Sequence, residues 1–67
     1  MRQHTVSDAR RHRRLTQVEL AKRAGISRAT LCRLEAGQML PRLTTVRRLE
    51  AALRLRLRFE APEEAAQ

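Results

Sequence analysis

The side chains best suited to chemistry in this sequence are its arginines, fourteen of them against a single lysine, Lys22. An arginine guanidinium is a planar fork of donors that pairs with phosphate oxygens or with O6 and N7 of guanine. Residues 1–58 contain all fifteen cationic residues and four acidic ones, a net charge of +11, whereas residues 59–67 carry −3. This distribution predicts a basic body that binds a polyanion such as nucleic acid.

Groups that could catalyse a reaction or hold a metal are few. His4 and His12 have no cluster of acids or cysteines at ligand spacing, and Cys32 is the only cysteine, so neither a zinc site nor a disulfide can be assembled. We interpret Cys32 as a small packing residue rather than a redox switch, because no second cysteine can resolve an oxidised thiol. The sequence therefore predicts no enzyme, no metal and no cofactor.

The length of the chain limits how much surface one copy can bury. A chain of 67 residues forms one small domain that buries about 60% of the surface exposed in its unfolded state, so we expect association to contribute to stability. The longest apolar run, Ala51–Leu53, is too short for a membrane span or a signal peptide, which predicts a cytoplasmic location and no membrane partner. A single aromatic residue, Phe59, argues against recognition of single strands by base stacking.

Capping residues mark where the first two helices begin. Thr5 or Ser7 can cap a first helix. Thr16 with Glu19 three residues later forms a capping box, which opens a second helix that continues to Ala24.

The second helix is followed at once by a third. Gly25 is suited to the left-handed conformation that commonly ends a helix, and Ser27 caps a helix over residues 28–36. Leu31 and Leu34 form the inner face of that helix. Two short helices joined by such a bend predict a helix-turn-helix, whose second helix reads DNA bases with its N-terminal residues. The residues at that position are Arg28, Ala29, Thr30 and Arg33.

Hydrophobic periodicity changes near the C-terminus. A helix from about Leu43 to Leu53 carries a core-facing stripe, and the pattern then alternates strictly, which predicts a strand over residues 56–60. Because no other segment alternates, we expect the strand to pair with a second copy, and the alternative is that it folds onto its own core. Residues 61–67 are expected to form a disordered acidic tail. The helical stripe is Leu43, Val46, Leu49, Ala52 and Leu53, and the strand stripe is Leu55, Leu57 and Phe59.

Residues 15–37, LTQVELAKRAGISRATLCRLEAG, resemble the helix-turn-helix of the Xre, Cro and phage-repressor family. The resemblance covers residues 6–55, although family members commonly have glycine at the position of Arg54. The alternating ending resembles that of HipB-like antitoxins, whose C-terminal strands pair across a dimer. The resemblance implies an all-α, four-helix phage-repressor-like domain in residues 1–55, followed by a dimerisation strand in residues 56–60.

The family also implies roles for particular residues. Arg10 and Glu35 are expected to form a partly buried ion pair that braces the first helix against the third. Leu55, Leu57 and Phe59 are expected at the dimer interface. The expected base contacts are Arg28, Ala29 and Arg33, and the expected DNA backbone contacts are Thr16, Gln17, Thr30, Gln38 and Arg42.

These expectations combine into one hypothesis: a homodimeric, sequence-specific repressor of double-stranded DNA with a palindromic operator. In it the cationic run at residues 10–14 flanks the DNA backbone, whereas an RNA-binding or nuclear-import patch is the alternative. A second hypothesis is an antitoxin that autoregulates its operon and neutralises a toxin protein, for which the acidic tail would supply the contact. A third is an architectural DNA binder without sequence preference.

Overall fold

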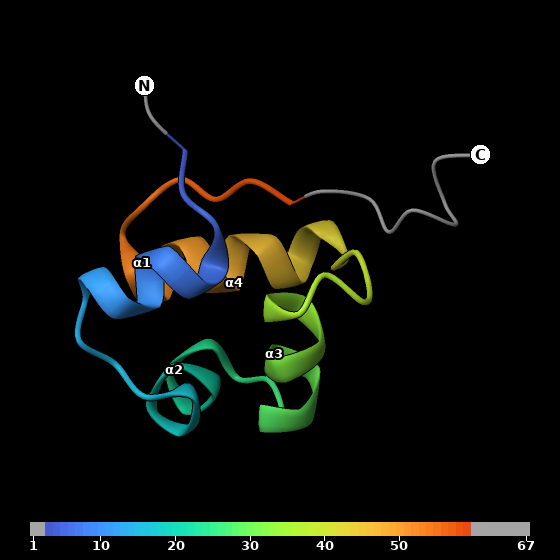
Figure 1. The fold of residues 1–67 in the computed structure, drawn as a ribbon, viewed down its shortest axis with the longest axis horizontal. Helices are drawn as coiled ribbons and strands as arrows, with labels where there is room; N and C mark the ends of the chain where they lie inside the picture. The colour runs from blue at the N-terminus through green and yellow to red at the C-terminus, as the bar shows by residue number, and fades with distance from the viewer. Residues whose placement is uncertain (1–2, 60–67) are drawn as a thin grey trace.

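Four helices follow one another in the structure, a computed structural model that describes residues 3–59. They are α1 (Val6–His12), α2 (Gln17–Ala24), α3 (Arg28–Glu35) and α4 (Leu43–Leu53). In Figure 1, α1 lies across α4, α3 stands nearly upright beneath them, and α2 is seen almost along its axis. The all-α, four-helix architecture is therefore confirmed.

Polar side chains fix the starts of the first two helices. The Thr5 hydroxyl accepts a hydrogen bond from the Asp8 backbone N–H over 3.2 Å, so Thr5 rather than Ser7 caps α1. The capping box of α2 is complete, because the Thr16 hydroxyl accepts from the Glu19 N–H and the Glu19 carboxylate accepts from the Thr16 N–H. The hydrogen bond from the Thr16 backbone lowers the pKa of Glu19.

The core lies where α2 packs against α4 and α3, and four leucines are fully buried in it. Burial of one such side chain stabilises the fold by about 1.5 to 3 kcal/mol. The expected stripe on α4 begins later than predicted: Leu43 is the first residue of α4 and is 63% exposed, and the buried residues of the helix are Leu49 and Leu53 in its second half. The fully buried leucines are Leu20, Leu31, Leu49 and Leu53.

The segment after α4 is extended and has a partner within its own chain. The His4 N–H donates to the Arg56 carbonyl and the Arg58 N–H donates to the His4 carbonyl, each over 2.9 Å, which forms a parallel bridge between His4 and Leu57. The Leu57 N–H points the other way and donates to the Glu50 carboxylate over 2.9 Å. Figure 1 shows the N-terminal and C-terminal segments crossing there. This finding corrects the expectation that the segment has no partner in one copy.

The alternation predicted for residues 56–60 is present in the part that is described. Leu57 is buried, whereas Arg56 and Arg58 are exposed. Over the described residues the pairing is a single bridge rather than a continuous strand. Residue 60 and the tail expected at 61–67 lie outside the described residues.

The C-terminal end of α4 is capped by a side chain from α1. Arg54 ends the helix in the left-handed conformation with φ 55°, which is strained for a residue with a side chain. Arg13 donates from Nε to the Leu53 carbonyl over 2.7 Å and from Nη2 to the Arg54 carbonyl over 3.4 Å. These bonds satisfy carbonyls that have no partner within the helix, and they tie α1 to α4.

Candidate nucleic-acid interface

The bend between α2 and α3 is held by backbone hydrogen bonds. Gly25 has φ 71° and ψ 34°, the left-handed conformation that glycine adopts without strain. The Ile26 N–H donates to the Ala21 carbonyl over 3.0 Å, and the Ile26 side chain packs against the core. The bend therefore sets α3 at a steep angle to α2 (Figure 1), the arrangement of a helix-turn-helix.

At the start of α3, two hydroxyls are linked. The Ser27 hydroxyl accepts from the Thr30 N–H over 3.1 Å and donates to Thr30 Oγ1 over 2.9 Å. Ser27 thus caps the helix, as expected. Because Thr30 Oγ1 accepts this bond, its own hydroxyl proton is free to be donated to an oxygen outside the protein.

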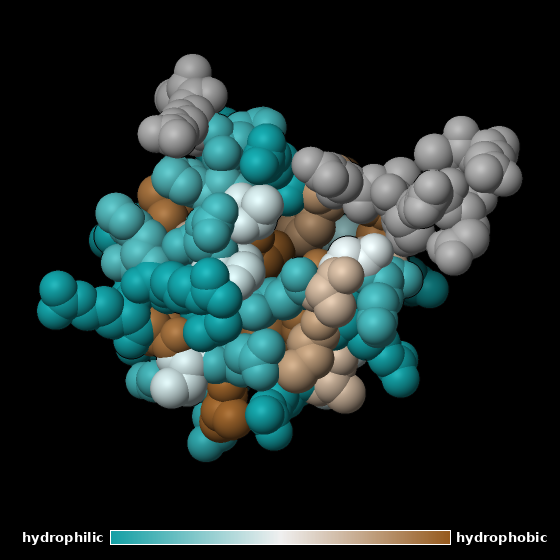
Figure 2. All heavy atoms as spheres, in the orientation of Figure 1, coloured by the Kyte–Doolittle hydropathy of each residue, from teal (hydrophilic) through white to brown (hydrophobic). Residues whose placement is uncertain are grey.

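The outer face of α3 carries exposed guanidinium groups. Arg28, Ala29 and Arg33 are exposed, whereas Leu31 and Leu34 on the opposite side are buried. Within residues 3–59, neither Arg28 nor Arg33 forms an ion pair with a carboxylate. Figure 2 shows a strip of mildly hydrophobic residues over α3, bordered by hydrophilic ones. This face therefore presents two guanidinium groups that have no ion-pair partner among the described residues, with small side chains between them.

The residues expected to contact the DNA backbone lie on two other segments. Thr16 is exposed and Gln17 half-buried at the start of α2, where the helix dipole favours an anion. Gln38 is exposed in the loop after α3, and its N–H donates to the Arg33 carbonyl over 3.0 Å. Arg42 is exposed and makes no capping bond to α4, so its guanidinium is not used to start that helix.

Arg10 and Glu35 are brought together as an ion pair with two hydrogen bonds. Arg10 Nε lies 2.7 Å from Glu35 Oε2, and Arg10 Nη2 lies 3.1 Å from Glu35 Oε1. A third bond runs from Arg10 Nη1 to the Leu15 carbonyl over 2.9 Å. The hydrogen bond to Glu35 raises the pKa of Arg10. Both side chains are at most 15% exposed, so the pair fixes α1 on α3.

The Arg10–Glu35 pair extends to the start of α2 through contacts that were not predicted from the sequence. Gln17 Nε2 donates to Glu35 Oε1 over 3.3 Å, and the Cys32 thiol donates to Gln17 Oε1 over 3.3 Å. Cys32 and Glu35 are three residues apart and therefore lie on one flank of α3. That spacing is the signal in the sequence, and it does not indicate which element the flank faces. Cys32 is half-buried and donates a hydrogen bond, a role beyond the packing that was predicted for it.

The cationic run at residues 10–14 divides into two groups. Arg10 and Arg13 are engaged with protein acceptors, as described above. Arg11 and Arg14 are exposed, and their side chains make no hydrogen bond within residues 3–59. Only these two arginines of the run are therefore free to flank DNA.

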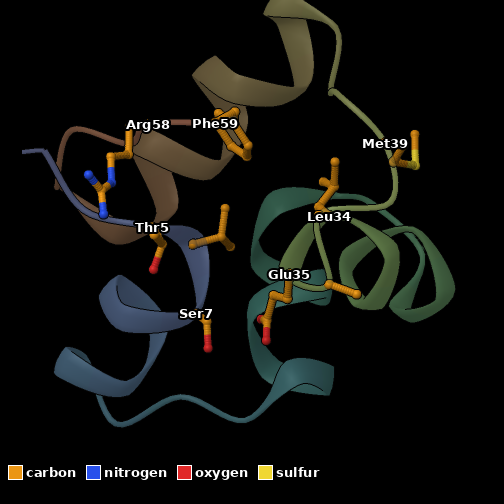
Figure 3. A pocket seen from close by; sticks show the side chains of 10 residues that line it. Thr5, Ser7, Leu34, Glu35, Met39, Arg58 and Phe59 are labelled. Atoms are coloured by element: carbon orange, nitrogen blue, oxygen red, sulfur yellow. The ribbon is translucent and has the colours of Figure 1, made fainter. Parts of the chain in front are cut away.

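The apolar stripe at the C-terminus also divides. Leu57 is 5% exposed and belongs to the core of its own chain, which is the alternative to a dimer contact considered from the sequence. Leu55 and Phe59 are half-buried. Phe59, Leu34 and Met39 are among the residues that line a pocket of about 250 Å³, and Figure 3 shows their side chains around it. Of the three expected dimer contacts, Leu55 and Phe59 are therefore the two whose side chains are still partly exposed to a second copy.

Within the described residues, no group of three or more histidine, cysteine, aspartate or glutamate side chains is placed to hold a metal ion. None of the helices found there is long and apolar enough to cross a membrane.

The chain matches a known protein family. A family model described as helix-turn-helix matches residues 6–59, a range that begins with α1 and ends one residue beyond the bridge segment. Every side chain expected to contact DNA lies within the matched range. None of the curated proteins and none of the solved structures compared with the chain matches it.

Proposed function

The chain belongs to the Xre/Cro-type helix-turn-helix family of DNA-binding transcription regulators, and from this premise we propose that it is a cytoplasmic, sequence-specific repressor that binds a pseudo-palindromic operator as a homodimer. The observation that carries the proposal is the outer face of α3, where Arg28 and Arg33 are exposed and unpaired within the described residues. Guanidinium groups without a partner in the protein can donate hydrogen bonds to phosphate oxygens or to the bases of DNA.

In the proposed complex, α3 lies in the major groove with its N-terminal end at the base edges. Arg28 and Arg33 each bind a guanine through O6 and N7, and Ala29 contacts a thymine methyl group. The small side chain of Ala29 supports this assignment, because it lets the helix approach the bases closely.

The DNA backbone is bound from both sides of α3. Thr16 and Gln17 meet one phosphate at the start of α2, where the dipole of the helix adds to the attraction. The free hydroxyl proton of Thr30 supports a second contact. Gln38 and Arg42 bind the strand on the other side of the groove.

A homodimer would supply both the symmetry and the stability that one copy lacks. The α3 helices of the two copies would bind half-sites about 34 Å apart on one face of the DNA. We place Leu55 and Phe59 at the interface, because both are apolar and only half-buried in one copy. Leu57 is excluded from it by its burial.

A second candidate function, neutralisation of a toxin protein, is favoured by the acidic residues Glu60, Glu63 and Glu64, which follow the basic domain. It is compatible with repression, since an antitoxin of this kind would also bind its own operator. Co-purification of the chain with the product of the neighbouring gene tests it, and the absence of a complex would remove it.

Selection of bound sequences from random duplex DNA tests the main proposal. We expect enrichment of a two-fold symmetric sequence, bound about 10³-fold or more tightly than random duplex at physiological salt. Equal affinity for the selected and random duplexes, with the same salt dependence, would contradict sequence-specific binding and favour the architectural alternative.

A further inference from the structure

The side-chain amide of Gln17 is held at both ends before any DNA is bound. Its Nε2 donates to Glu35 Oε1, and its Oε1 accepts from the Cys32 thiol, each over 3.3 Å. Both partners lie on α3, whereas Gln17 is the first residue of α2. The two contacts therefore join the recognition helix to the N-terminus of the helix before it.

The carboxylate of Glu35 sets the orientation of the amide. A carboxylate accepts hydrogen bonds and cannot donate, so the amide nitrogen must face Glu35. A neutral thiol donates, so the amide oxygen can face Cys32. Rotation of the amide by half a turn would set its oxygen against the carboxylate and break the bond to Glu35.

We propose that Cys32 is a positioning residue: its thiol locks the Gln17 amide so that the second Nε2–H points to a DNA phosphate. This inference rests on the proposed function, in which Gln17 binds the DNA backbone. Glu35 alone would hold only the nitrogen end of the amide, and the bond from Cys32 holds the oxygen end and so fixes the plane of the amide. Cys32 acts through Gln17 and contacts no base in this assignment.

The first test is made on the protein without DNA. It compares Cys32→Ser, which keeps a hydrogen-bond donor at this position, with Cys32→Ala, which removes it. The proton–nitrogen-15 correlation NMR spectrum shows the two side-chain amide protons of Gln17, which are identified by their loss in Gln17→Ala. We expect these signals to be shifted from those of the other glutamines in the wild type and in Cys32→Ser. In Cys32→Ala they move toward the values of the other glutamines. Unchanged Gln17 signals in Cys32→Ala would overturn the proposal.

Affinity for DNA gives the second test. With the duplex recovered by selection as the probe, we expect Cys32→Ala to weaken binding by about 2- to 5-fold, the effect of one weak hydrogen bond. In the Gln17→Ala background the same substitution should change the dissociation constant by less than about 1.5-fold. A loss that is equal in both backgrounds, with Gln17 signals that do not move, would mean that Cys32 only packs.

The two tests also separate this proposal from the one it rests on. If no duplex is bound, the proposed function fails, while the NMR signals still report whether Cys32 orients Gln17. If DNA binds normally and Cys32→Ala has no effect on either measurement, the positioning role fails and the proposed function stands.

Discussion

Arg10 and Arg28 carry the same guanidinium group in opposite surroundings. Arg10 is bonded to Glu35 and to the Leu15 carbonyl, whereas Arg28 is exposed on α3 with no ion pair within the described residues. An arginine bonded to protein acceptors through all three guanidinium nitrogens stabilises the fold, whereas one without such bonds is available to a ligand. The surroundings of Arg10 therefore indicate a structural role, and those of Arg28 support its proposed contact with DNA.

The Arg10–Glu35 pair predicts a large effect of Glu35→Ala on stability. The substitution leaves the partly buried Arg10 without its charged acceptor, so we expect the free energy of unfolding to fall by about 2 to 3 kcal/mol. Chemical denaturation measures the change. The control is Arg11→Ala, an exposed position next to Arg10 on α1, which should change stability by less than about 0.5 kcal/mol. Equal losses in the two variants would refute the bracing role.

Among residue roles, the Arg10–Glu35 pair could be anticipated from the family resemblance, but its extension to Gln17 and Cys32 could not. The side-chain contacts between α2 and α3 depend on how the bend at Gly25 sets the two helices. Neither periodicity nor capping signals contain that angle. Similarly, the engagement of Arg13 with the end of α4 joins residues 40 positions apart in the chain.

At the scale of elements, the starts of α2 and α3 were predictable because Thr16, Glu19 and Ser27 act on backbone groups only three residues away. The exposure of Leu43 was not predictable, because hydrophobic periodicity does not distinguish the first turn of a helix from its middle. The bridge between His4 and Leu57 involves one residue on each side, which leaves no alternation in the N-terminal segment to detect.

The capping box of α2 predicts a pH dependence that Glu19→Gln removes. The pKa of Glu19 lies below its ordinary value of 4.5 in the folded protein, so between the two values the unfolded chain binds more protons. Acidification in that window favours unfolding. The stabilisation by the carboxylate is complete above pH 4.5 and is lost as the pH falls through the folded-state pKa.

Thermal unfolding of the wild type and Glu19→Gln across this pH range checks the sign. We expect the wild type to have the higher Tm at neutral pH, and the difference between the two proteins to shrink on acidification. A difference that stays constant from neutral to strongly acidic pH would show that the carboxylate of Glu19 has the same pKa in both states.

On the scale of the whole molecule, a small core is joined to a strongly basic surface. The fifteen cationic residues all precede residue 59, and the described acids Glu35 and Glu50 are engaged inside the fold by Arg10 and the Leu57 N–H. Consequently little of the positive charge is neutralised by exposed acids in the domain. Such a surface favours binding to a polyanion and makes its affinity fall with salt.

Association of two copies is tested by Phe59→Ser. Because Phe59 is apolar and half-buried, the substitution should shift the proposed dimer to monomer in sedimentation while the helical content stays near that of the wild type. Leu57→Arg serves as the contrast: it places a charge in the core, so we expect loss of helical structure. A Phe59→Ser protein that remains a dimer would show that the interface lies elsewhere.

The central claim is that the N-terminal end of α3 reads bases, and the affinity of Arg28→Ala for a panel of operators tests it most directly. Each operator in the panel carries a substitution at one base pair of the selected sequence. We predict that Arg28→Ala binds the parent operator about 1 to 3 kcal/mol more weakly and no longer discriminates among bases at one position in each half-site. Uniform weakening across the whole panel, with discrimination intact at every position, would contradict the claim and assign Arg28 to a phosphate.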